Sequence, residues 1–148
     1  MIEQMITSFV ASTAFGIIFN VPKRALLLCG LVGLLGWMLY YLLALQELNA
    51  IVATLIAAVG VAMFSHVLAR WKRMPITVFG VSGIIPLVPG GLAYDAMRHL
   101  VESEYTTAVQ QGVKALMVSG SIAMGLVLSE VLHQLIRKTW VNREMKKT

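Results

Sequence analysis

The chain has 148 residues, of which 58% are hydrophobic and 13% are charged, and its formal net charge is +5. Soluble domains carry about 25% charged residues, so these few charges could not cover the surface of so apolar a soluble fold. The composition argues against a soluble enzyme and a disordered tail. It predicts an all-α integral membrane protein, with one membrane domain over residues 1–148.

Five apolar runs divide the chain, at approximately 4–20, 25–45, 49–69, 76–94 and 112–136. Each is long enough to cross a hydrocarbon core of ~30 Å at ~1.5 Å per residue, the first only just. Backbone groups in lipid must be satisfied within the segment, so we expect transmembrane helices. The first run follows Glu3 and no basic residue, which favours a retained helix over a signal peptide.

Small and aromatic residues distinguish the second run. Gly30, Gly33 and Gly36 favour close helix contact, and Trp37, Tyr40 and Tyr41 at the outer end are typical of an interfacial belt. Before this run, Asn20 and Pro22 predict a helix stop and restart. Cys29 is the single cysteine, which excludes an internal disulfide and a cysteine-based metal site.

The fourth run contains Pro86 and Pro89, followed by Gly90 and Gly91. Proline lacks an N–H and clashes with the preceding turn, so we expect a broken helix. Broken helices in membranes are tolerated where their backbone groups face a polar cavity, and in transporters they commonly form the substrate site. The predicted substrate-binding residues extend across this break: Ser82, Pro86, Pro89, Gly90, Gly91, Tyr94 and Asp95. A proline kink shaped only for packing is the alternative.

The fifth run carries small residues at four-residue spacing, Ala115, Ser119 and Ala123, and also Ser121 with Gly125, which favour packing against protein. Between the fourth and fifth runs, residues 95–111 predict an amphipathic helix and then a turn near 103–107. Ionisable residues at membrane depth are candidates for ion coupling. Glu130 and His66 are the two that we assign, although Glu130 pairing with Arg137 at the interface is an alternative.

Most of the basic residues lie on one side of the predicted membrane domain. If every run crosses, ten of the 12 Lys and Arg residues share one side, and only Arg98 and Lys114 lie on the other. The positive-inside rule then places the N-terminus outside and the C-terminus in the cytoplasm. The ten are Lys23, Arg24, Arg70, Lys72, Arg73, Arg137, Lys138, Arg143, Lys146 and Lys147. Because they lie in separate loops, we expect no nucleic-acid partner.

Two motifs resemble the threonine/serine exporter family. Residues 19–26, Phe-Asn-Val-Pro-Lys-Arg-Ala-Leu, are similar to the start of its small C-terminal-type half. Residues 85–97 resemble its I-P-x-x-P-G-x-x-A-Y-x-A-M signature. The resemblance implies the small subunit of a two-component exporter in the bacterial inner membrane. It also implies a larger second subunit with a soluble segment and further helices, and export of threonine and serine or of succinate-type dicarboxylates.

No G-x-x-x-x-G-K-[ST] run is present, so we expect secondary transport of a small molecule, without a cofactor or a metal. Membrane lipid is the other expected partner, and self-association of the chain is an open alternative. A channel or a structural scaffold subunit also fits the sequence. A more remote alternative is an intramembrane serine protease, because Gly80, Ser82 and Gly83 match G-x-S-G, with His66 or His133 as the base.

Overall fold

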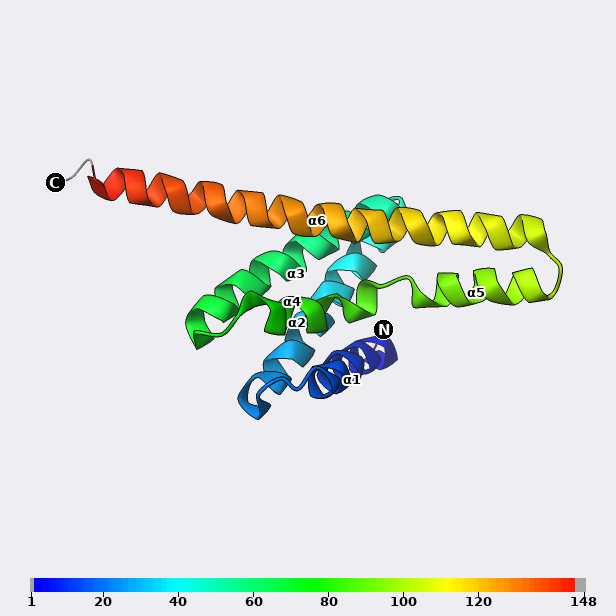
Figure 1. Ribbon diagram of the computed structural model, residues 1–148, viewed down its shortest axis with the longest axis horizontal. Coiled ribbons are helices and arrows are strands. Elements are labelled where there is room, and N and C mark those ends of the chain that lie inside the picture. The colour runs from blue at the N-terminus through cyan, green and yellow to red at the C-terminus, as the bar shows by residue number, and fades with distance from the viewer. Residues whose placement is uncertain (1, 146–148) are drawn as a thin grey trace.

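The computed structural model describes residues 2–145, with their side chains except at 137 and 139–145. Lys146 and Lys147 of the predicted basic group lie outside the described residues. The elements, in chain order, are α1 (Ile2–Ile18), α2 (Lys23–Leu45), α3 (Ala50–Lys72), α4 (Ile76–Ile84), a 3₁₀ turn η1 (Ile85–Leu87), α5 (Gly90–Val101) and α6 (Tyr105–Met145). All regular elements in the described part are helices, which confirms the all-α membrane fold (Figure 1).

The turns between the helices follow the local sequence. Asn20 adopts the left-handed conformation between α1 and α2, and Pro22 caps α2, as the sequence predicts. Asn49 caps α3 by accepting a hydrogen bond from the Ile51 amide at 3.1 Å. Arg73 takes the left-handed conformation at the end of α3, and Pro75 precedes α4. These short connections make α2 and α3 antiparallel neighbours.

Helix α2 lies at the centre of the bundle and contacts α1, α3 and α4. Its glycines permit these contacts. A Cβ at Gly33 would collide with Ser12 of α1, and one at Gly36 would collide with Val61 of α3. On α1 the buried residues are Ser8, Ser12 and Gly16, so a face of small and polar residues packs against protein.

Helix α6 is 41 residues long, or about 60 Å at 1.5 Å per residue. Its later half runs parallel to α3, because Gly125 packs on Leu55 and Ala58 while Glu130 reaches His66. Its first half lies antiparallel to α5, and this α5–α6 hairpin extends beyond the other helices (Figure 1). Ion pairs of Arg98 with Glu102 and of His99 with Glu104, each at 3.0 Å, stabilise the far end of the hairpin.

The helix lengths refine the predicted spans. Helices α2, α3 and residues Tyr105–Ile136 of α6 are long and apolar enough to cross a membrane. The segments Ile76–Leu87 and Gly90–Val101 together make a fourth candidate span, bent by 48°. Helix α1 has 17 residues, or about 25 Å, which is shorter than a core of ~30 Å. The count of five is therefore reached only if α1 also crosses, and that remains a prediction.

The helices extend beyond two of the predicted segments. The fifth apolar run was expected at 112–136, and α6, which contains this run, begins at Tyr105 and continues to Met145. Hydropathy locates the membrane-embedded part of a helix, whereas its polar ends continue the same backbone pattern. Residues 95–111 contain the end of α5, a turn at 102–104 and the start of α6, so the expected turn lies slightly earlier than predicted.

Candidate functional site

The predicted break in the fourth run is present. Helix α4 ends at Ile84, η1 includes Pro86, Val88 is extended, and Pro89 caps α5. Neither proline has an N–H for the helical ladder, so the backbone leaves the α-helical path between 85 and 89. The Gly90 amide turns back to donate to the Val88 carbonyl at 2.7 Å. The break lies about 18 Å along the span that begins at Ile76.

A cavity of about 260 Å³ opens at this break, which we call the break cavity. Four helical segments contribute to it: α2, α3, the η1–α5 connection and α6. The residues that line it include Trp37, Tyr40, Thr54, Pro89, Leu92 and Lys114. The break cavity thus combines apolar walls with an indole N–H, two hydroxyls and one cation.

The structure divides the predicted substrate-binding residues. Pro86 and Pro89 line the break cavity, and Gly90 and Gly91 begin α5 directly beside it, with open space around both α-carbons. Tyr94, whose exposed fraction is 68%, and the partly buried Asp95 lie further along α5 and do not line the cavity.

Ser82 is buried on α4, away from the break cavity, and donates a hydrogen bond to the Val78 carbonyl at 3.1 Å. It lines a different hollow, at the α1–α2 turn. In the described part of the chain no hydrogen bond joins Ser82 to His66 or His133, so the protease alternative gains no support from the geometry. The assignment of Ser82, Tyr94 and Asp95 to the substrate remains a prediction.

The break cavity also contains residues that the sequence did not assign to the site. Trp37 and Tyr40 were read as an interfacial belt, and Lys114 was counted among the charges on the outer side. Lys114 had a signal in the sequence, because it is the only Lys or Arg inside the run 112–136. A charge within an apolar span indicates a functional position.

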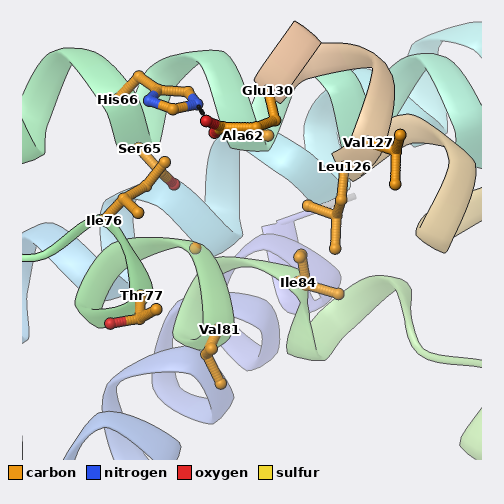
Figure 2. Close-up of a pocket in the computed structure, with 11 residues that line it drawn as sticks. Ala62, Ser65, His66, Ile76, Thr77, Val81, Ile84, Leu126, Val127 and Glu130 are labelled. Atoms are coloured by element: carbon orange, nitrogen blue, oxygen red, sulfur yellow. Dashed lines mark ion pairs between the residues drawn. The ribbon is translucent and has the colours of Figure 1, made fainter.

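A second cavity, of about 340 Å³, lies between α3, α4 and α6, and we call it the His66 cavity (Figure 2). Its walls are largely apolar, and the charged groups gather at one end. There His66 Nε2 lies 3.3 Å from Glu130 Oε2, so the two predicted ion-coupling residues meet. The side chain of His66 is 13% exposed and that of Glu130 is 53% exposed.

Two neighbours extend this pair. Gln134 Nε2 donates to Glu130 Oε1 at 3.0 Å, and the His133 ring stacks on the His66 ring with centroids 4.1 Å apart. The alternative partner of Glu130, the Arg137 side chain, lies outside the described residues. Within residues 2–145 no group of three or more His, Cys, Asp or Glu residues is arranged to hold a metal ion. The cluster therefore offers protonatable groups on two facing helices.

The two cavities lie at opposite ends of α3. Thr54 borders the break cavity and His66 borders the other, about 18 Å apart along the helix. The α4–η1 segment borders both cavities: Thr77 and Val81 line the His66 cavity (Figure 2), and Pro86 lines the break cavity. A movement of this one segment would alter both cavities.

Comparison with known proteins places the chain in a family. No solved structure matches it. A family model described as threonine/serine exporter, ThrE, matches residues 4–132, which include α1 to α5 and most of α6. The match covers both cavities and the broken span, in agreement with the two motifs at 19–26 and 85–97. The chain therefore belongs to the threonine/serine exporter family, a family of membrane transporters rather than enzymes.

Proposed function

We propose that this chain is the small subunit of a two-component exporter of small carboxylates or amino acids, which works by secondary transport. The observation that carries the proposal is the broken span, which opens on a cavity enclosed by α2, α3 and α6. Irregular backbone at membrane depth supports a binding role, since its freed polar groups need a partner. Threonine, serine and a succinate-type dicarboxylate are the candidate substrates.

The coupling ion in this proposal is the proton. His66 and Glu130 form the pair that would bind and release it, from the cavity at the other end of α3. Ionisable groups that face each other across helices at membrane depth support such a role. Because α4 and η1 border both cavities, proton release at His66 and Glu130 would be linked to substrate release at the break.

We further propose that the protein lies in the bacterial inner membrane, with a larger second subunit that supplies further helices and a soluble segment. The apolar residues on the outer faces of α5 and α6 support contact with lipid or with another subunit. They include Met97, Val101, Val109, Val113 and Leu116. The presence of an adjacent reading frame that encodes a soluble segment and several helices would favour the two-component form over self-association.

Reconstitution tests the transport proposal. The chain is placed in liposomes with its second subunit, and efflux of labelled threonine, serine and succinate is measured. An exporter saturates and shows counterflow, whereas a channel does neither. We expect Pro89→Ala, Gly90→Leu and Tyr94→Phe to be the informative variants, with Trp71→Phe, an exposed position far from both cavities, as the matched control.

The pattern of variant activities separates the alternatives. Loss of efflux in the Pro89 and Gly90 variants, with normal efflux in the control, supports a substrate site at the break. Normal efflux in all three informative variants refutes it. A scaffold subunit would tolerate these changes as long as the second subunit still assembles, which copurification of the two chains would show.

A further inference from the structure

We propose that Lys114 binds the carboxylate group of the transported substrate, inside the break cavity and together with the first amides of α5. This inference rests on the proposed function and deepens it, because it assigns the charge that recognises the substrate. The chemistry that it names is a carboxylate, which threonine, serine and dicarboxylates share.

The first argument is the position of Lys114. It stands on α6 within the apolar run 112–136 and lines the break cavity opposite Pro86, Pro89 and Leu92. Within the described residues Lys114 has neither an ion pair nor a hydrogen bond, and no acidic side chain lines this cavity. Lys114 is an exposed residue that also lines the break cavity, and an ammonium group within an apolar span is costly unless an anion or acceptors compensate it. A bound carboxylate would supply that compensation.

The second argument is the set of N–H groups around the same cavity. The first turn of α5 has no side-chain cap, and the amides of Gly91 and Leu92 have no acceptor among the described residues. Such amides, with the positive end of the helix dipole, favour anions. Trp37, which also lines the cavity, has a buried Nε1 that lacks an acceptor in the described part of the chain. Residues from three elements that carry unpaired N–H groups therefore line or adjoin a cavity whose lining includes no acidic side chain.

The third argument concerns Gly90 and Gly91. Neither has a positive φ, and a Cβ at either position would meet nothing within 4 Å. Packing and backbone strain therefore do not require glycine at these two positions. Their effect is to leave the first amides of α5 uncovered, which is a use of glycine where a ligand approaches the backbone.

Binding is measured with Trp37 as the reporter. The full chain with Trp71→Phe and Trp140→Phe retains only this tryptophan, and it is placed in lipid nanodiscs. Succinate, threonine and serine are titrated separately, and ethanolamine, which is serine without its carboxylate, is the matched control ligand. We expect a saturable change in Trp37 emission with at least one carboxylate and none with ethanolamine. Equilibrium dialysis with labelled ligands gives an independent measure.

Three variants test Lys114. We expect Lys114→Gln to raise the half-saturating concentration by about tenfold or more, the effect of losing one charge-assisted hydrogen bond. Lys114→Arg retains the charge and is expected to bind within a few-fold of the parent protein. Lys72→Gln removes an equal charge from the end of α3, outside both cavities, and is expected to leave binding unchanged.

The inference is overturned if Lys114→Gln binds as Lys72→Gln does, if ethanolamine binds as well as serine, or if dialysis detects no carboxylate binding to the parent chain. The proposed function can fail separately. Carboxylate binding that depends on Lys114, without any transport in liposomes, would refute the exporter proposal and leave the assignment of Lys114 standing. Transport with normal affinity in Lys114→Gln would overturn the assignment of Lys114 alone.

Discussion

Glu130 and His66 place a carboxylate and an imidazole in contact between α3 and α6. Glu130 accepts a hydrogen bond from Gln134 with one oxygen and faces His66 with the other, at 3.3 Å. His133 stacks on His66 and adds a second imidazole. A proton that binds at the His66–Glu130 pair changes the net charge between α3 and α6. Glu130 supplies the carboxylate of this pair, so a substitution at this one residue tests the proposed coupling role.

We expect Glu130→Gln to lower the rate of transport that an imposed pH gradient drives by about tenfold or more, because one protonation step is lost. The amide keeps the shape of the side chain and can still bond to a neighbour, but it cannot exchange a proton. The measurement is substrate efflux from proteoliposomes after a pH jump. Glu102→Gln on the α5–α6 hairpin is the matched control, since Glu102 pairs with Arg98 far from both cavities. Equal pH-driven efflux in both variants would contradict a coupling role for Glu130.

The residues of the candidate site differ in how far the sequence could identify them. Pro86 and Pro89 were identified because a missing N–H is a property of the residue itself. Glu130 was identified because a carboxylate in an apolar run is rare. Lys114 was counted only as an outer-side charge, because the residues that line the break cavity with it, such as Leu92 and Thr54, come from other helices. Which residues line a cavity depends on how several helices pack together, and the sequence of one span does not show that packing.

At the scale of helices, the contact between α3 and α6 fixes the relation of the two cavities. The buried side of α6 carries Ala115, Val118, Ile122, Gly125 and Ser129, at spacings of three and four residues. The sequence had named two series of small residues, Ala115, Ser119 and Ala123, and Ser121 with Gly125. Ser119 and Ala123 are exposed, whereas Ala115, Ser121 and Gly125 are buried. Small residues occur on several faces of α6, so spacing alone did not select the face that packs. The close approach is at Gly125.

We expect Gly125→Leu to destabilise the folded protein by about 1–3 kcal/mol, the usual cost of overpacking. A Cβ at Gly125 would lie 2.9 Å from both the Leu55 carbonyl oxygen and the Ala58 Cβ. Gly120→Leu on the same helix is the matched control, because a Cβ there meets nothing within 4 Å. Thermal unfolding in detergent, followed by size-exclusion chromatography, compares the two variants. Equal melting temperatures would show that α3 and α6 do not pack as described.

At the scale of the whole molecule, the arrangement of the helices brings basic residues to one end. Helices α2 and α3 are antiparallel neighbours, so the start of α2 and the end of α3 lie together, and α6 runs parallel to α3. Lys23, Arg24, Arg70 and Lys72 therefore share the end toward which α6 carries Lys138. The far end of the α5–α6 hairpin carries Glu102 and Glu104 at the opposite side. This asymmetry supports the proposed orientation through the positive-inside rule.

Labelling of introduced cysteines tests that orientation. In a Cys29→Ala background, Thr106→Cys stands near the start of α6 and Lys72→Cys at the end of α3, and both positions are exposed. Because the basic end is expected in the cytoplasm, a membrane-impermeant maleimide applied to intact spheroplasts is expected to label Thr106→Cys and to label Lys72→Cys only after permeabilisation. Both variants label in permeabilised cells, which controls for reactivity. Labelling of Lys72→Cys but not Thr106→Cys in intact spheroplasts would invert the topology. It would then place the His66 cavity toward the outside and not toward the cytoplasm.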